Sequence, residues 1–185
     1  MKMFNESIRV LPYEHDSHWA YIYQWYHSGK YDYFFGNTQM VDSSMAANYG
    51  NNGQKYVITD AKDISKVIGV ASVTDIQERH RNCNYGIMID EAFQGKKIGV
   101  EATIMIVNRI LNYDNMFKVI ARVDPKNLSS KKGSIEVGFE EEALLKQDVY
   151  YDGEFHDVIR MKITKGMFNK KYKSRRKKDH VEGHK

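Results

Sequence analysis

The chain has 185 residues, of which 42% are hydrophobic and 28% are charged. These values are ordinary for a globular protein and suit a single domain that can bury a core. One cysteine, Cys83, excludes a disulfide within the chain and fits a reducing compartment. The start of the chain shows no signal peptide, and no segment approaches the roughly 20 apolar residues that cross a bilayer. We therefore expect a cytoplasmic protein without a membrane partner.

The positive charge lies at the C-terminal end. The formal net charge is +4, yet residues 165–185 hold nine Lys and Arg against Asp179 and Glu182, which is +7 and leaves −3 for the first 164 residues. We therefore predict a domain over residues 1–165 and a basic, disordered tail over residues 166–185. The alternative is that the tail is an electrostatic arm for nucleic acid or the ribosome, with Tyr172 as a single stacking ring.

The first part of the chain mixes strand and helix patterns. Residues Ile8–Glu14 alternate apolar and polar, which predicts a strand. Aromatic residues at helical spacing predict a helix over His18–Tyr26, capped by Asp16 or Ser17. A polar helix or loop is expected at Asp42–Gly53. Between them lies an aromatic cluster, interpreted either as core and cleft wall or as substrate contacts, consisting of Tyr31, Tyr33, Phe34 and Phe35.

The middle of the chain predicts a β region followed by a long helix. Three runs predict strands of an antiparallel meander, at Lys55–Thr59, Lys66–Ile76 and Cys83–Ile89. The clearest helix is expected over Gly99–Asn112, because one apolar stripe recurs there at helical spacing. That buried stripe is expected to comprise Val100, Thr103, Ile104, Val107, Ile110 and Leu111.

The C-terminal part predicts a strand, a helix and a hairpin. The strand is expected at Phe117–Val123 and the helix at Leu128–Glu136. Asp152-Gly153 is a strong signal for a tight turn, and it joins the strands Ala143–Tyr151 and Glu154–Thr164. The whole order of elements predicts a mixed α/β (α+β) sandwich with one βαβ unit in the middle.

Residues 87–102, IMIDEAFQGKKIGVEA, carry the motif with a chemical meaning. A strand ends there, a loop with two glycines follows, and an amphipathic helix begins. Several backbone N–H groups and the positive end of the helix dipole then converge, which suits a pyrophosphate. Gly95 and Gly99 allow the backbone to approach closely. The spacing matches neither a Walker loop nor a dinucleotide fingerprint.

The spacing of this loop resembles a signature of the GNAT superfamily of N-acetyltransferases. Gln94–Gly99 is similar to Gln/Arg-x-x-Gly-x-Gly/Ala, and Glu101-Ala102 follows as is common in the family. Asn127–Ser130 with Gly138-Phe139 is similar to the family's second motif. The terminal hairpin and His80-Arg81 look like the branch of spermidine and ribosomal-protein N-terminal acetyltransferases. The resemblance spans residues 8–163.

This resemblance implies a GNAT fold: a central, twisted, mostly antiparallel sheet with helices on both faces and a C-terminal β-hairpin. The sheet would open as a splayed V between Cys83–Ile89 and Phe117–Val123, and acetyl-CoA would bind there. An amine would attack the thioester directly, and members of the branch often form homodimers. The implied cofactor contacts are the backbone of Met88, Ile89 and Asp90 for the pantetheine arm, the amides of Gln94, Gly95, Lys96, Lys97, Ile98, Gly99 and Val100 for the pyrophosphate, and Asn127 near the thioester.

Three positions depart from the family's pattern. Lys97 stands where the signature has its second glycine, and a positive φ there would strain a lysine. Ser134 stands in place of the usual general-acid tyrosine, and Asn84 in place of a carboxylate. The proton carriers that we predict instead are Ser130, Glu78 and Tyr150, with His80 as a further candidate. The predicted substrate contacts are Tyr31, Tyr33 and Phe34.

The first functional hypothesis is an acetyl-CoA-dependent N-acetyltransferase acting on a protein N-terminus or a small amine. A polyamine is disfavoured, because Tyr21–Phe35 carries a single acidic residue, Asp32. The alternatives are a catalytically degenerate GNAT-fold module and a nucleic-acid-associated protein that acts through its tail. The seven histidines lack metal-ligand spacing, so no metal is predicted. Cys83 is expected to be a small buried residue rather than a nucleophile.

Overall fold

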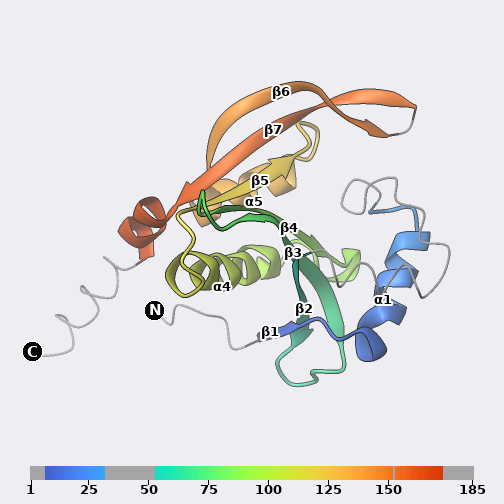
Figure 1. Ribbon diagram of the computed structural model, residues 1–185. Coiled ribbons are helices and arrows are strands. Elements are labelled where there is room, and N and C mark those ends of the chain that lie inside the picture. The colour runs from blue at the N-terminus through green and yellow to red at the C-terminus, as the bar shows by residue number, and fades with distance from the viewer. Residues whose placement is uncertain (1–6, 32–52, 152, 173–185) are drawn as a thin grey trace, which may run out of the picture.

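The computed structural model describes residues 7–31, 53–151 and 153–172 (Figure 1). Its seven-stranded sheet has the order β1-β2-β3-β4-β5-β7-β6. Only β4 and β5 pair in parallel among these neighbours, so the predicted mixed α/β fold with a mostly antiparallel sheet is confirmed. The strands are β1 (Ile8–Pro12), β2 (Gln54–Asp60), β3 (Val67–Gln77), β4 (Asn82–Ile89), β5 (Lys118–Val123), β6 (Glu140–Tyr151) and β7 (Glu154–Thr164).

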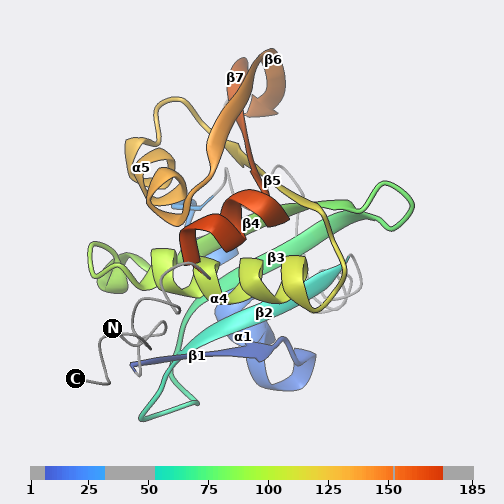
Figure 2. The same ribbon diagram turned by 90° about the vertical axis from the view of Figure 1, so that its left-hand side faces the viewer.

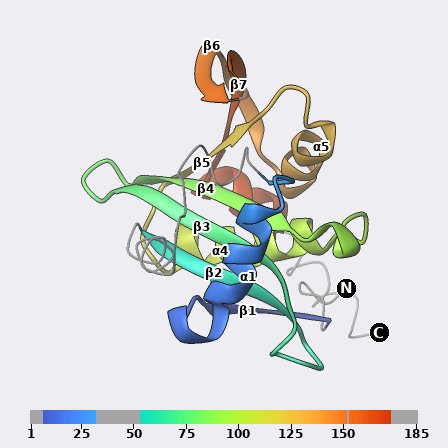
Figure 3. The same ribbon diagram turned by 90° about the vertical axis from the view of Figure 1, so that its right-hand side faces the viewer.

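Helices cover both faces of the sheet, as expected. They include α1 (His15–His27), the short 3-10 helix η1 (Glu91–Phe93), α4 (Ile98–Asn112) and α5 (Leu128–Val137). Figure 2 shows α4 in front of the sheet, and Figure 3 shows α1 in front of the opposite face. The larger core lies on the α4 face, while a smaller cluster on the α1 face packs Ile22 and Trp25 against Val57, Val70 and Met88. Burial of these apolar side chains fixes the two faces.

The buried stripe of α4 is rotated slightly from the one expected. Val100 and Ile104 are only partly buried, whereas Ala102 and Ile106 are almost fully buried. Val100 instead lies beneath α5, where its side chain approaches the Cβ position of Gly133 at 3.7 Å. The stripe therefore consists of Ile98, Ala102, Thr103, Ile106, Val107, Ile110 and Leu111.

The sheet opens between its two parallel strands. Pairing of β4 with β5 ends at Tyr85 and Ala121, although β4 continues to Ile89 and β5 to Val123. The backbones beyond this point are no longer bridged to each other. This is the splayed V that the family resemblance implied.

The start of α1 differs from the prediction. The helix begins at His15, and its N-cap is Glu14, which makes no side-chain cap; Asp16 lies inside the first turn. The N–H of Glu14 donates to Nδ1 of His18 at 2.9 Å. The start of the helix is therefore held by the imidazole of His18, which accepts from the N–H of Glu14, and not by the expected side-chain cap of Asp16 or Ser17.

The folded part extends past residue 165. Residues 165–172 are helical, and Phe168 and Tyr172 are 1% and 7% exposed. The hydroxyl of Tyr172 donates to the carbonyl of Val137 at 2.8 Å, so this ring packs in the core rather than being available for stacking on a base. The boundary predicted at residue 165 is thus too early. Residues 173–185, the predicted segment at 42–52, Tyr33 and Phe34 lie outside the described residues.

Across residues 7–31, 53–151 and 153–172, no helix is long and apolar enough to span a bilayer.

Candidate active site

The connection from β4 to α4 forms a compact loop at the mouth of the V. The side chain of Asp90 caps η1 by accepting from the N–H of Ala92 at 2.9 Å. Nε2 of Gln94 donates to the carbonyl of Ile89 at 2.9 Å, so this signature residue ties the loop to the end of β4. Gly95 then has φ +76°, a conformation that glycine adopts without steric cost. A Cβ at Gly95 would have no atom within 4 Å, so the strand-to-loop turn is open to a ligand.

Lys97 is the N-cap of α4 and has a left-handed backbone, with φ 61° and ψ 5°. A positive φ is the condition under which we expected a lysine to be strained here, and Lys97 has it. Its side chain makes no cap, but its Nζ lies 2.7 Å from Oε1 of Glu136 on α5. Hydrogen bonding to that carboxylate raises the pKa of Lys97. The lysine therefore joins the loop to α5 while keeping its charge.

The first turn of α4 points its N–H groups at the mouth of the V. Ile98, Gly99 and Val100 lie at the start of the helix, where N–H groups lack intrahelical acceptors. Together with the helix dipole they favour an anion. A Cβ at Gly99 would lie 3.4 Å from Cγ1 of Ile89, so glycine there allows the helix to approach β4. The arrangement suits an anion, and the binding of a diphosphate by these amides stays a prediction.

The backbone of β4 is divided between β3 and the V. The N–H of Asp90 donates to the carbonyl of Ile68 at 3.0 Å, toward β3. The backbone N–H and C=O groups of successive residues in β4 point alternately to its two sides. Those of Met88 therefore also point to β3, whereas those of Ile87 and Ile89 point into the V. Of the three residues predicted for the pantetheine arm, Ile89 has backbone groups that face the V, and Ile87, which was not predicted, shares this orientation. Contact of either residue with the cofactor stays a prediction.

Asn127 is the N-cap of α5. Its Oδ1 accepts from the N–H of Ser130 at 2.9 Å, a typical capping bond that leaves the side-chain amide nitrogen for other partners. Ser130 is exposed in the first turn of α5. The structure thus brings Asn127 and Ser130 together at the end of the β5 arm, and their roles in the reaction stay predictions.

Two of the other predicted proton carriers lie far from this end, and the third is on the hairpin. Glu78 and His80 are exposed in the turn before β4. Because β4 has eight residues, this turn lies roughly 25 Å from the cofactor loop at its other end. Tyr150 is 54% exposed on the hairpin, where its ring packs against Phe155. The structure does not gather Glu78, Tyr150 and Ser130 into one constellation.

A group that the sequence did not predict lies at the end of β5. The hydroxyl of Tyr151 donates to Oδ2 of Asp124 at 2.6 Å, and both side chains are half-buried. The ring of Tyr151 stacks on His156 at 3.7 Å between centroids. Asp124 directly follows β5, so the pair lies beside that arm of the V. A protonatable chain of this kind can accept and release a proton.

A second missed carboxylate is near Asn84. Oδ2 of Asp75 lies 3.4 Å from Nδ2 of Asn84, at a bulge in β3 where Asp75 has φ 47°. Regular alternation along β3 does not reveal such a bulge, so this contact could not be predicted from the sequence.

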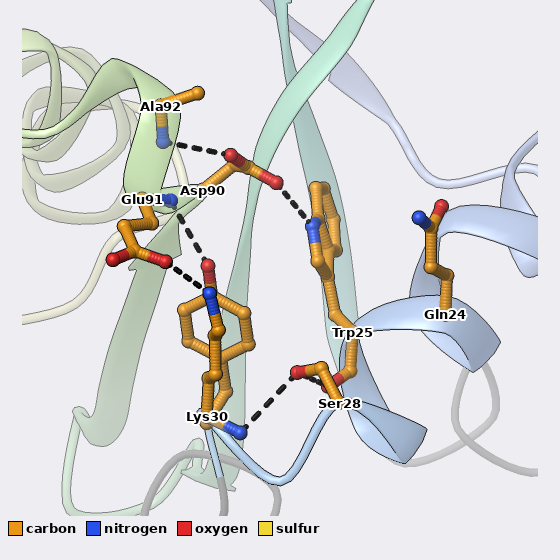
Figure 4. Close-up of a pocket in the computed structure, with 8 residues that line it drawn as sticks. Gln24, Trp25, Ser28, Lys30, Asp90, Glu91 and Ala92 are labelled. Atoms are coloured by element: carbon orange, nitrogen blue, oxygen red, sulfur yellow. Dashed lines mark hydrogen bonds and ion pairs between the residues drawn. The ribbon is translucent and has the colours of Figure 1, made fainter.

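A hollow of about 370 Å³ lies between the end of α1 and η1, on the opposite face from α4 (Figure 4). Nε1 of Trp25 donates to Oδ2 of Asp90 at 2.6 Å, and Lys30 pairs with Glu91. The hydroxyl of Tyr31 accepts from the N–H of Glu91 at 2.9 Å. Tyr31, a predicted substrate contact, therefore holds the end of α1 against the turn that leads into the cofactor loop.

Cys83 is fully buried, and burial raises the pKa of its thiol to about 11. This agrees with the prediction of a small core residue and argues against a covalent acetyl-cysteine. Among the residues that the structure describes, no group of three or more His, Cys, Asp or Glu could hold a metal ion.

Comparison with known proteins gives a family and a set of relatives. The model of the acetyltransferase (GNAT) domain matches residues 5–140. Spermidine N(1)-acetyltransferase of Vibrio cholerae serotype O1 is 29% identical over 124 residues, 65% of this chain and 68% of the relative. Ribosomal protein uS5-alanine N-acetyltransferase of Escherichia coli strain K12 is 25% identical over 103 residues, 55% of this chain and 53% of the relative.

Solved structures agree in fold. Spermidine N-acetyltransferase from Vibrio cholerae, in complex with CoA and spermine, superposes with a TM-score of 0.80 at 19% identity, covering 89% of this chain and 99% of that one. A dodecameric structure of spermidine N-acetyltransferase from the same organism gives a TM-score of 0.77 at 20% identity, covering 91% and 99%. At this level of identity the likeness concerns the fold alone.

Proposed function

The chain belongs to the GNAT acetyltransferase family, and we propose that it is an acetyl-CoA-dependent N-acetyltransferase that acetylates a primary amine by direct attack on the thioester. The observation that carries this proposal is the joint presence of the open V and the helix terminus at its mouth. Pairing of β4 with β5 stops at Tyr85, and the N–H groups of α4 begin after Lys97. An elongated ligand that has a thioester at one end and a diphosphate at the other can occupy both the V and the helix terminus.

The cofactor would lie along the β4 arm. The N–H groups of residues 95–100 would hold the diphosphate, and the backbone of Ile87 and Ile89 would bond to the pantetheine amides as a missing strand would. Asn127 would approach the thioester end from the β5 arm. These contacts orient the acyl carbon for attack, which is the main contribution that binding can make to such a reaction.

The transfer itself balances without further reagents. The neutral amine forms a C–N bond to the acyl carbon, the C–S bond breaks, and CoA leaves as a thiolate. The proton lost from nitrogen passes to that thiolate, directly or through an intermediate carrier. Tyr151 and Asp124 are our candidates for this carrier, because their hydrogen bond lies beside the β5 arm.

For the acceptor we favour the N-terminus of a protein or peptide over a polyamine. On the sheet face opposite α4, the Glu142 carboxylate is shared by three cations: Arg160 Nε lies at 3.0 Å, and the ammonium groups of Lys118 and Lys162 lie at 3.5 and 3.8 Å. Glu140 lies opposite Lys162 across the strands, so three cations face two carboxylates, and the remaining positive charge disfavours a polycation. The same surface tolerates a single amine and attracts acidic residues that follow it.

Spermidine is the second candidate, favoured by the relative with 29% identity. A direct comparison separates the two. The protein is incubated with acetyl-CoA and either a peptide with a free N-terminus, the same peptide with a blocked N-terminus, or spermidine, and thiol release and product mass are measured. We expect acetylation of the free peptide only. Preference for spermidine would overturn the acceptor assignment, and a lack of any acetylated amine would overturn the activity.

A further inference from the structure

The tyrosine at the apex of the V faces the helix that follows the cofactor loop. Tyr85 is the last residue of β4 that pairs with β5, opposite Ala121. Its side chain lies on the α4 face and is 6% exposed. Burial raises the pKa of the Tyr85 hydroxyl, so the group stays a hydrogen-bond donor at any pH of interest.

Two hydroxyl groups connect this apex to the first turn of α4. The hydroxyl of Tyr85 donates to Oγ1 of Thr103 at 3.0 Å. Oγ1 of Thr103 in turn donates to the carbonyl of Gly99 at 2.6 Å. Thr103 is 6% exposed, so both bonds lie in the core, where an unpaired hydroxyl is costly. The chain of bonds therefore links β4 to the residue at which the cofactor loop enters the helix.

The loop before Gly99 depends on such a link. Lys97 makes no side-chain cap, and its bond to Glu136 is exposed to solvent. Exposed ion pairs hold geometry weakly, whereas buried hydrogen-bonded networks hold it well. The buried chain is thus a firm connection between the V and the helix terminus, in addition to the bond of Gln94 to Ile89 and the packing of Gly99 on Ile89.

We infer that Tyr85 is a positioning residue for acetyl-CoA: through Thr103 it holds the first turn of α4 at a fixed distance from the apex of the V. The inference rests on the proposed function, which places the diphosphate at this turn and the thioester in the V. One ligand bridges both places, so a shift of the helix terminus misplaces one end whenever the other is bound. The contribution of Tyr85 is then to cofactor affinity rather than to the chemical step.

The core offers a matched control for this hydroxyl. Tyr172 is also buried, at 7% exposed, and its hydroxyl donates to the carbonyl of Val137 at 2.8 Å. Replacing either tyrosine by phenylalanine keeps the ring and removes one buried hydrogen bond. Tyr172 lies in the C-terminal helix and its hydroxyl bonds to the end of α5 rather than to α4, so its variant reports what the loss of one buried phenol hydroxyl costs outside the β4–α4 connection.

The test measures CoA binding by calorimetry and thermal stability for the wild type, Tyr85→Phe and Tyr172→Phe. We expect both variants to lose similar stability, while only Tyr85→Phe binds CoA more weakly, by about three- to tenfold, with kcat unchanged. Thr103→Val is expected to have the same effect as Tyr85→Phe, and Thr103→Ser to restore binding. If Tyr85→Phe fails to fold, the comparison of CoA affinity between Thr103→Val and Thr103→Ser tests the inference instead.

The outcomes separate this inference from the proposed function. A wild type that does not bind CoA contradicts the proposed function. A wild type that binds CoA, with equal affinity in Tyr85→Phe and in Thr103→Val, overturns the role of Tyr85 alone. A loss of affinity in Tyr172→Phe as large as that in Tyr85→Phe also overturns it, because the effect would then be general.

Discussion

The loop from β4 to α4 and the tip of the β6–β7 hairpin lie on either side of the V and are built in different ways. The loop offers backbone groups: a glycine at φ +76° and the first N–H groups of a helix. The hairpin tip acts through side chains, with Tyr151 bonded to Asp124 and stacked on His156. One region therefore depends on chain conformation and the other on which side chains meet.

This difference suggests a division of labour. In the proposed function, backbone groups would bind the diphosphate that every turnover shares, and a backbone site tolerates many side chains. Tyr151 and Asp124 meet although they lie 27 positions apart in the sequence, and we propose that such side chains govern proton transfer and the choice of acceptor. Changes in the loop should therefore alter cofactor binding, and changes at the hairpin tip should alter turnover.

The largest effect is expected from Gly95→Glu. A side chain at φ +76° strains the loop, and its carboxylate would face the phosphates of acetyl-CoA. We expect the affinity for acetyl-CoA, measured by calorimetry, to fall by about 100-fold or more.

Gly153→Glu is the matched control. Gly153 has φ +79° and, like Gly95, no atom within 4 Å of its Cβ position, but it lies in the hairpin turn. Gly153→Glu introduces the same backbone strain and the same charge as Gly95→Glu. We expect the affinity of this variant for acetyl-CoA to equal that of the wild type. Equal losses in the two variants would mean that the loop does not bind the diphosphate.

A smaller effect is expected from Tyr151→Phe, on the other side of the comparison. The variant removes the proton that Tyr151 shares with Asp124 and keeps the ring stacked on His156. We expect kcat to fall by about 100-fold while the affinity for acetyl-CoA is unchanged. Tyr113→Phe, at a tyrosine that is 77% exposed at the end of α4, serves as the control for a lost phenol. A normal kcat in Tyr151→Phe would remove the pair from the mechanism.

The smallest effect concerns the backbone of Lys97. Lys97→Ala and Lys97→Gly both remove the contact with Glu136, but only glycine relieves the positive φ of 61°. We expect Lys97→Gly to melt about 2–4 °C above Lys97→Ala in a thermal scan. Equal melting temperatures would show that the left-handed conformation costs little at this position.

Much of the fold and the cofactor loop could be predicted, because their signals are local. Each of these signals can be recognised within a short stretch of sequence: the apolar stripe on α4, the Asp152-Gly153 turn and the glycines of the loop. Even the strain at Lys97 followed from knowing which position takes a positive φ. The early end predicted for the domain has a simple cause: the lysines around Phe168 mask an apolar pair, Phe168 and Tyr172, that packs in the core.

The acceptor side was predicted poorly for a different reason. Strand alternation does not show which of two adjacent tyrosines meets Asp124, because the hairpin contains two shifts in register before them. The bond from Trp25 to Asp90 spans 65 positions. Contacts of this kind depend on the folded arrangement and leave no short motif.

Hydrogen exchange with and without CoA tests the central claim most directly, because it reads the backbone of both regions in one experiment. We predict slower exchange of the amides in residues 94–102 when CoA binds, with those of residues 153–158 unchanged. Slower exchange at the hairpin, with none at the loop, would contradict it.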